Sequence, residues 1–177
     1  MIAAQILATA LLEDGKYAAT FPNFTQERRG APVEAFIRFG TEPIRERTRI
    51  YHPDVLVIFD KILVRSPVCY AGLKDGGSVI LNQKGESFLP PTKASLETLA
   101  MVDATSIALQ EMGVPITNSC MLGAFARVTG LLKLESLATA FKEFLSGDVL
   151  QKNKRSMERG YNEVRIRRMG DRAASAS

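Results

Sequence analysis

Two adjacent arginines followed by a glycine are the residues of this sequence best suited to contact an anion. Arg28, Arg29 and Gly30 lie in residues 21–33, a segment rich in proline, glycine and charge, which is typical of an ordered loop. Guanidinium groups bind carboxylate or phosphate through two parallel hydrogen bonds, and glycine allows a close approach to the backbone. The alternative is an ion-pair network with Glu27 that only holds the loop, because two neighbouring cations cannot be buried without partners.

Polar side chains follow the predicted strands at the point where a ligand would bind. Asp60 comes directly after the apolar run 55–59, Asn82 after the run 78–81, and Asn118 at the start of a predicted helix. In parallel α/β sheets, ligands bind beyond the carboxyl ends of the strands. These three residues are therefore candidate ligand contacts. The alternative for each is that it caps the helix or turn that follows.

The inventory of reactive residues excludes several kinds of chemistry. The chain has one histidine and two cysteines, too few for a four-cysteine iron–sulfur cluster or a Cys/His zinc site. Cys69 and Cys120 are far apart in the sequence, so two buried, reduced thiols in a cytoplasmic protein are expected. His52 precedes a proline in a predicted turn, where we assign it a structural role. No Walker loop and no G-x-G-x-x-G motif is present.

Hydrophobic patterning predicts a Rossmann-like, three-layer α/β fold with a mostly parallel sheet. Unbroken apolar runs are typical of strands covered on both faces, and helical spacing separates them. Strands are predicted over 33–39, 55–59, 78–81 and 101–103, and helices over 1–12, 104–112, 117–130, from Lys133 onward and through the basic segment to Tyr161. Residues 83–100 are interpreted mostly as connection. Buried strands alternating with helices give such a layered sheet.

Length and charge point to one domain with a basic end. A chain of 177 residues with 46% hydrophobic and 24% charged residues fits a single soluble domain, predicted over residues 1–170, with 171–177 as a disordered tail. No run reaches the roughly 18 apolar residues of a membrane span. The segment 152–172 holds all of the excess positive charge, and the rest of the chain is slightly acidic. It is interpreted as a solvated helix face or as a contact to a partner subunit or anion; without interleaved aromatics, nucleic acid is disfavoured.

A family resemblance emerges at the arginine loop. The segment Phe21-Pro-Asn-Phe-Thr-Gln-Glu-Arg-Arg-Gly-Ala-Pro-Val33 resembles the gamma subunit of the 2-oxoacid:acceptor oxidoreductases, which include pyruvate:ferredoxin oxidoreductase. The resemblance continues through His52-Pro-Asp54, Gly72-Leu73, residues 77–82, Asp103-Ala-Thr105, Pro115-Ile-Thr-Asn118, Met121-Leu-Gly-Ala-Phe-Ala126 and Arg159-Gly-Tyr161. Several motifs in the same order make it specific, and it covers the chain to about Arg168.

The resemblance implies a non-catalytic subunit of a larger enzyme in the cytoplasm. Such complexes oxidatively decarboxylate a 2-oxoacid with thiamine diphosphate and Mg²⁺. They pass electrons through [4Fe-4S] clusters to ferredoxin or another acceptor, and they transfer the acyl group to coenzyme A. The alpha, beta and delta-type subunits are expected to hold the thiamine and the clusters, so this chain would hold no cofactor alone. The gamma domain is associated with coenzyme A, for which Arg28, Arg29, Gly30, Asn82 and Asn118 are the candidate contacts.

Two departures from the family pattern qualify this interpretation. Family members begin with a strand and a glycine-rich stretch, whereas this sequence begins inside the following helix. We therefore expect the natural reading frame to start upstream of Met1, or another segment to fill the gap. The stretch Glu-Arg-Arg-Gly-Ala-Pro at residues 27–32 favours the pyruvate and branched-chain members over the 2-oxoglutarate ones. Thr25-Gln26, however, stands where many pyruvate-type members have Gly-Pro, which keeps an aryl 2-oxoacid such as phenylglyoxylate open as well. The alternative function is a free-standing α/β module that binds a nucleotide-like anion.

Overall fold

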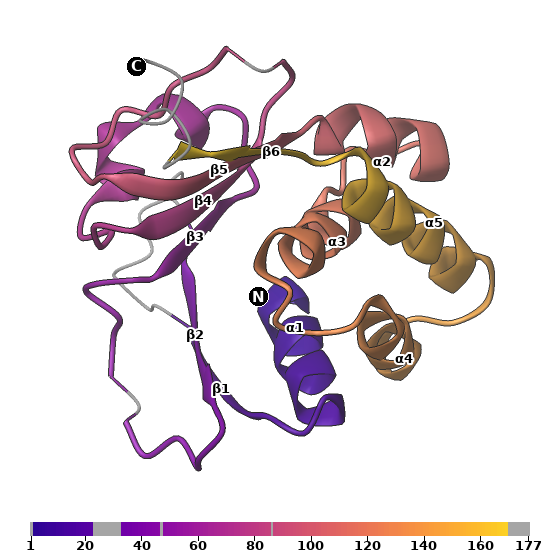
Figure 1. Cartoon of the computed structure of the whole chain (residues 1–177). Helices are drawn as coiled ribbons and strands as arrows, with labels where there is room; N and C mark the ends of the chain where they lie inside the picture. The colour runs from indigo at the N-terminus through magenta and orange to yellow at the C-terminus, as the bar shows by residue number, and fades with distance from the viewer. Residues whose placement is uncertain (1, 23–32, 47, 86, 170–177) are drawn as a thin grey trace.

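In the described part of the chain, one helix is followed by five strands, which two short 3₁₀ turns interrupt between the third and the fourth, and then by four consecutive helices and a final strand. The predicted alternation of buried strands with helices is therefore wrong, although the helices still cover one side of the sheets (Figure 1). The computed structural model describes residues 2–22, 33–46, 48–85 and 87–169 (Figure 1). Its elements are α1 (Ile2–Glu13), β1 (Tyr17–Pro22), β2 (Ala35–Gly40), β3 (Val55–Ile58), η1 (Leu63–Arg65), η2 (Pro67–Tyr70), β4 (Gly77–Asn82), β5 (Leu96–Val102), α2 (Ala104–Met112), α3 (Asn118–Thr129), α4 (Leu134–Phe144), α5 (Gly147–Glu163) and β6 (Arg165–Arg168). None of the described helices has both the length and the apolar character needed to cross a membrane.

A four-stranded sheet in the order β3-β4-β5-β6 forms the centre of the fold. β3, β4 and β5 run parallel to one another, and β6 joins β5 in the antiparallel sense. β1 and β2 form a separate antiparallel pair. The predicted α/β class with a mostly parallel sheet is confirmed.

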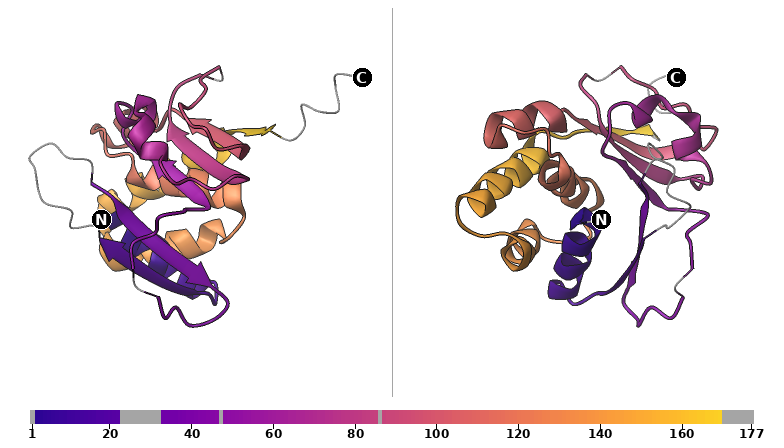
Figure 2. Two further views of the ribbon diagram at one scale, coloured as in Figure 1. Left: turned by 90° about the vertical axis from the view of Figure 1, so that its left-hand side faces the viewer. Right: turned by 180° about the vertical axis from the view of Figure 1, so that it is seen from behind.

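The sheet separates two apolar cores because successive side chains along a strand point to opposite faces. Ile80 packs against the α-helices, whereas its neighbours Val79 and Leu81 pack against the 3₁₀ turns that contain Val64 and Tyr70. Figures 1 and 2 show the α-helices together on one side of the sheets and the two 3₁₀ turns on the other. The three predicted layers are therefore present, with the third built from short turns.

The β1–β2 hairpin is held against helix α1. Ala18, Ile37 and Phe39 lie on one face of the hairpin and pack on the helical core, to which α1 contributes Ile6 and Leu11. This packing fixes the ends of the segment that joins the two strands.

Three strands differ from the sequence prediction. β1 lies mostly before the predicted loop 21–33, where no strand was predicted, and includes the first two residues of that loop. β5 begins at Leu96 rather than 101, and β6 occupies the end of the basic segment. β6 has the sequence Arg-Ile-Arg-Arg and lies mostly exposed at the sheet edge, so it carries little of the apolar pattern that identifies a strand. The predicted tail 171–177 lies outside the described residues, and the domain bounds stay a prediction.

Candidate functional site

The arginine loop leaves the β1–β2 hairpin, but its central residues lie outside the described part of the chain. Arg28, Arg29 and Gly30 belong to the undescribed segment 23–32. The last register pair before that segment joins Pro22 to Ala35. The structure therefore fixes where the loop begins and ends, and the contacts of its arginines stay a prediction.

Asn82 lies at the carboxyl end of β4, as predicted, and is 1% exposed. Its amide nitrogen donates to the Phe59 carbonyl oxygen at 2.8 Å and to Thr105 Oγ1 at 2.9 Å, and its amide oxygen accepts from the Thr105 backbone N–H at 3.3 Å. Both amide hydrogens are thus used inside the protein. Asn82 joins the ends of β3 and β4 to the start of α2, which favours a positioning role at this end of the sheet over direct contact with a ligand.

Beside Asn82, an aspartate and a lysine meet above the start of α2. Asp103 caps α2 by accepting hydrogen bonds from the backbone N–H and the hydroxyl of Ser106, at 3.3 and 2.8 Å. Lys61, after β3, donates to Asp103 Oδ1 at 2.9 Å. Partial burial disfavours the charged carboxylate, but the hydrogen bonds from Lys61 and Ser106 outweigh burial and hold the pKa of Asp103 below its ordinary value. Sequence reasoning singled out Asp60 but missed its neighbour Lys61.

The remaining candidates at strand and helix ends are placed separately. Asp60 is exposed and accepts from the Ile62 backbone N–H at 2.8 Å, so it shapes the turn after β3. Asn118 begins α3 and is half-buried. The hydrogen bonds of Asn82 lead to β3 and α2, and none of those described leads to Asn118. A direct ligand contact by Asn118 stays a prediction.

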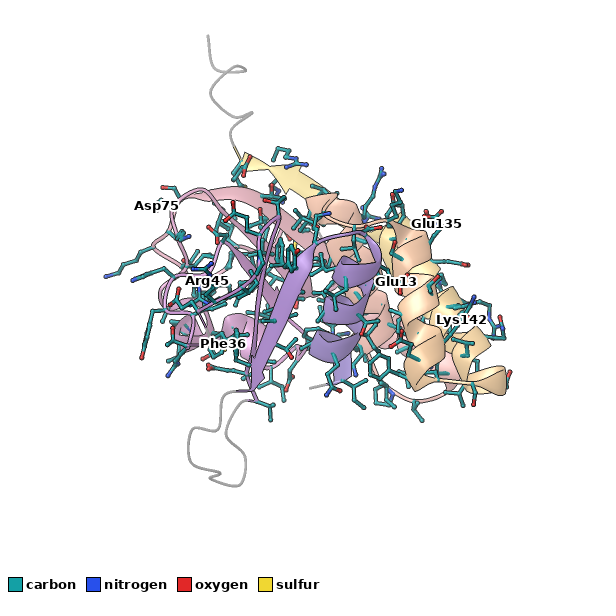
Figure 3. The ribbon with its side chains drawn as sticks, turned by 90° about the horizontal axis from the view of Figure 1, so that it is seen from below. Glu13, Phe36, Arg45, Asp75, Glu135 and Lys142 are labelled. Carbon is teal, nitrogen blue, oxygen red and sulfur yellow. The ribbon has the colours of Figure 1, made fainter. Side chains whose placement is uncertain are left out.

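A stack of aromatic rings around one guanidinium lies on the outer side of the hairpin. The guanidinium carbon of Arg49 lies 5.8 Å from the centre of the Phe36 ring and 5.6 Å from the centre of the Tyr51 ring. Arg49 also donates to Glu34 at 3.5 Å. Figure 3 shows Phe36 on the side of the hairpin away from the helices. Sequence reasoning missed this stack because its members come from separate segments without a shared period.

The basic C-terminal helix is largely neutralised by partners within the chain. Arg155 and Arg159 both contact Glu111 of α2 at 3.1 Å, and Arg159 also pairs with Glu163 at 2.6 Å. Hydrogen bonds from Arg155 and Arg159 lower the pKa of Glu111. This part of the predicted basic surface therefore holds α5 against α2.

The other reactive residues have structural surroundings. His52 Nδ1 lies 3.3 Å from the Gly72 carbonyl oxygen, which supports its predicted structural role. Cys69 is half-buried and Cys120 is buried, and neither forms a disulfide. Among the described residues, no three His, Cys, Asp or Glu side chains gather as a metal site.

Comparison with known proteins places these elements in a family. The family described as "Pyruvate ferredoxin/flavodoxin oxidoreductase" matches residues 1–163, which is nearly all of the described chain. The chain belongs to the pyruvate ferredoxin/flavodoxin oxidoreductase family. The resemblance predicted from the sequence motifs is thereby confirmed.

Two curated members of the oxidoreductase family match almost end to end. The common gamma subunit of the pyruvate/ketoisovalerate oxidoreductases of Thermococcus kodakarensis is 50% identical over 164 residues, which are 92% of this chain and 89% of that protein. The gamma subunit of the NADH-dependent phenylglyoxylate dehydrogenase of Aromatoleum evansii is 41% identical over 179 residues, covering 99% and 93% of the two chains.

A solved structure of the oxidoreductase family has the same fold. The pyruvate oxidoreductase subunit PORC of Thermotoga maritima superposes with a TM-score of 0.79 and 36% identity, over 93% of this chain and 89% of that one. In the present chain, His52 of the motif His52-Pro-Asp54 lies against Gly72, whose backbone leaves no room for a side chain beside the Tyr51 carbonyl. His52 and Gly72 therefore link the connection between β2 and β3 to the connection between β3 and β4.

Proposed function

We propose that this chain is the gamma-type subunit of a 2-oxoacid:acceptor oxidoreductase complex. The observation that carries the proposal is the 50% identity to a gamma subunit over nine-tenths of both chains. The matched fold of a pyruvate oxidoreductase subunit supports it independently. As part of the complex, the chain contributes to subunit assembly and to the binding of coenzyme A.

The reaction of the proposed complex is the oxidative decarboxylation of a 2-oxoacid to its acyl-coenzyme A, with electrons delivered to ferredoxin or another acceptor. Thiamine diphosphate with Mg²⁺ supplies the decarboxylation chemistry, and [4Fe-4S] clusters carry the electrons. A four-cysteine cluster needs more thiolates than the two cysteines of this chain. We therefore assign the thiamine and the clusters to alpha, beta and delta-type partner subunits in the cytoplasm.

The substrate of the complex belongs to the 2-oxoacid class, and partner subunits select its side chain. One relative is named as a subunit common to pyruvate and ketoisovalerate oxidoreductases, and another belongs to a phenylglyoxylate dehydrogenase. The side chains of these three 2-oxoacids are a methyl group, a branched alkyl group and an aryl ring, which differ greatly in size and shape. A gamma fold shared by enzymes for all three supports a role outside the pocket for the substrate side chain.

The coenzyme A contact is assigned to the hairpin loop and to Asn118, with Asn82 in a supporting position. Coenzyme A carries a 3′-phosphorylated ADP end, which suits the paired guanidiniums of Arg28 and Arg29 beside Gly30. Asn82 supports the carboxyl ends of β3 and β4 through its internal hydrogen bonds, and Asn118, the first residue of α3, is a second candidate contact.

Purification of the tagged chain from its native cells tests the assignment to a complex. We expect a stable assembly that contains iron and thiamine and reduces an acceptor only when both a 2-oxoacid and coenzyme A are added. Removal of this chain should abolish coenzyme A-dependent turnover. A chain that purifies alone and binds adenine nucleotides without partners would overturn the proposal in favour of a free-standing module.

Substitution of the loop arginines tests the coenzyme A contact. Replacing Arg28 and Arg29 together by alanine should raise the KM for coenzyme A by about tenfold or more, because charge-assisted bonds to phosphate are lost. Lys142→Ala is the matched control: Lys142 is an exposed cation on the opposite side of the molecule from Phe36 (Figure 3). An unchanged KM in an intact complex would reject this contact.

A further inference from the structure

The Tyr51 ring is fixed at the surface rather than packed in a core. Tyr51 is 67% exposed, although Arg49 lies against its ring. Arg49 is in turn held by the Phe36 ring and by Glu34 on the hairpin. The ring stays mostly open to solvent, so it gains little free energy from apolar burial. Packing within this chain therefore does not explain why a large aromatic side chain is held at this surface position.

The backbone of Tyr51 is fixed as well as its ring. Gly72 has a φ of +80°, and a Cβ at that position would overlap the Tyr51 carbonyl oxygen, so the two backbones touch. His52 Nδ1 lies 3.3 Å from the Gly72 carbonyl oxygen, and the Lys74 backbone N–H donates to the Pro53 carbonyl oxygen at 3.2 Å. Because the ring is held in place by Arg49 on a fixed backbone, stacking of a ligand on it costs the protein little side-chain conformational entropy.

The chemistry of the stack fits a nucleotide better than a simple apolar group. Every nucleobase can stack on an aromatic face. Arg49 has five N–H donors, and its bond to Glu34 uses one of them. The side chains of Arg49 and Glu34 are each 45% exposed. A base on the Tyr51 ring would therefore have a guanidinium beside it that can pair with a neighbouring phosphate.

We propose that Tyr51, stacked on Arg49, forms the binding surface for the adenine base of coenzyme A, with Arg49 available to a phosphate of the same ligand. This inference rests on the proposed function, which supplies the ligand, and it adds residues that neither the motifs nor the strand ends indicated. The site consists only of described residues on β2 and on the connection between β2 and β3.

Binding to the purified complex without any 2-oxoacid tests the proposal, because no turnover is then involved. Isothermal titration calorimetry would use coenzyme A, adenosine 3′,5′-bisphosphate and pantetheine, which lacks the adenine nucleotide. Tyr51→Ala should weaken binding of the first two by about tenfold, as expected for loss of one base stack, and leave pantetheine unchanged. Tyr51→Phe keeps the ring and should stay within about twofold. Tyr17→Ala, another exposed tyrosine on the hairpin, should have no effect.

The outcomes separate this inference from the proposed function. If Tyr51→Ala leaves the dissociation constants unchanged while the double change at Arg28 and Arg29 raises the KM for coenzyme A, the inference is wrong and the proposed function stands. If Tyr51→Ala lowers the yield of assembled complex and the complex that does form binds coenzyme A normally, the stack is a contact to a partner subunit and the inference is also wrong. If no complex with thiamine and iron exists, the proposed function itself is wrong.

Discussion

Gly123 of α3 and Gly160 of α5 face each other's helices, so that the two backbones are in direct contact. A Cβ on Gly123 would overlap the Met157 carbonyl oxygen, and a Cβ on Gly160 would overlap the Cys120 carbonyl oxygen. Neither glycine has a positive φ. Glycine is therefore required at both positions because the two helices lie too close together for a side chain, and not because of the backbone conformation. Both belong to motifs that carry the family resemblance, and the structure gives those motifs a packing role.

Gly123→Ala should destabilise the chain although alanine is the better helix former. Alanine gains about 1 kcal/mol in helix propensity, but overlap with a backbone carbonyl forces α3 and α5 apart, and overpacking of this kind costs about 1–3 kcal/mol or more. We expect a net loss of about 2 kcal/mol in the free energy of unfolding, measured by urea denaturation. Gly40→Ala, where a Cβ meets only ordinary contacts near 4 Å, should change it by less than about 0.5 kcal/mol. Equal stability of both variants would contradict the packing argument.

Local sequence signals predicted the helices well. Helix α2 was predicted over 104–112 and is observed at Ala104–Met112. Asp103 caps its start, and Gly113, with a φ of +74°, ends it. Both signals lie within a few residues of the helix, so they can be read without knowledge of the tertiary structure.

Features that depend on distant segments were not predicted from the sequence. Three of the four residues of β6 are arginines, so it is a strand only because it pairs with β5, which lies more than sixty residues earlier in the chain. The stack of Arg49 on Phe36 and Tyr51 depends on a connection folding back over the hairpin. Asn82 was placed correctly at a strand end, but its partners, Phe59 and Thr105, are set by the neighbouring elements.

Asp14 should contribute to stability by capping α4 from the end of α1, and this contribution should depend on pH. Asp14 accepts hydrogen bonds from the Lys133 backbone N–H at 2.7 Å and from Ser136 Oγ at 2.5 Å. Burial disfavours the charged form, but these bonds outweigh burial and lower the pKa of Asp14 from 3.8. A group whose pKa is lowered by folding stabilises the fold above its unfolded value and loses that effect as the pH falls through the folded pKa.

Asp14→Ala should therefore lower the free energy of unfolding by about 1 kcal/mol at neutral pH, the usual cost of a lost cap. The gap between the two proteins should shrink below pH 3.8, as the wild-type carboxylate becomes protonated. Urea denaturation across the acid range measures both quantities. Glu13→Ala, at the exposed neighbouring position, should give no comparable gap. A gap that stays constant down to low pH would show that the carboxylate charge is not its source.

Cys120 should be chemically inert in the folded chain. Burial, followed by the nearby Glu163 carboxylate, raises the pKa of the Cys120 thiol to about 12, and the thiolate is the reactive form. In a Cys69→Ala variant, the remaining thiol should react with a disulfide reagent at mildly alkaline pH only when denaturant is added. The reciprocal Cys120→Ala variant keeps the half-buried Cys69 and should react in the native state. Prompt reaction of Cys120 in the folded protein would mean that the α3–α5 contact opens readily.

Substitution of Asn82 should lower the stability of the fold more than it weakens the binding of coenzyme A. Asn82→Ala removes three hydrogen bonds and leaves the Phe59 carbonyl and the Thr105 backbone N–H without their partner at a half-buried junction. Unsatisfied groups of this kind cost about 1–3 kcal/mol each, so we expect a loss of about 2–4 kcal/mol in the free energy of unfolding. Gln83→Ala, at the adjacent position, should cost less than about 0.5 kcal/mol.

The positioning role of Asn82 is distinguished from direct ligand contact by comparing two measurements on one variant. Asn82→Asp keeps the size of the side chain but replaces the donating amide group with a carboxylate oxygen that faces the Phe59 carbonyl, so it should be destabilised about as strongly as Asn82→Ala. In complexes that still assemble, the dissociation constant for coenzyme A should rise much less than it does when Arg28 and Arg29 are replaced. The opposite pattern, with normal stability and weak coenzyme A binding, would make Asn82 a ligand contact. In that case its amide hydrogens would be needed by the ligand and not by Phe59 and Thr105.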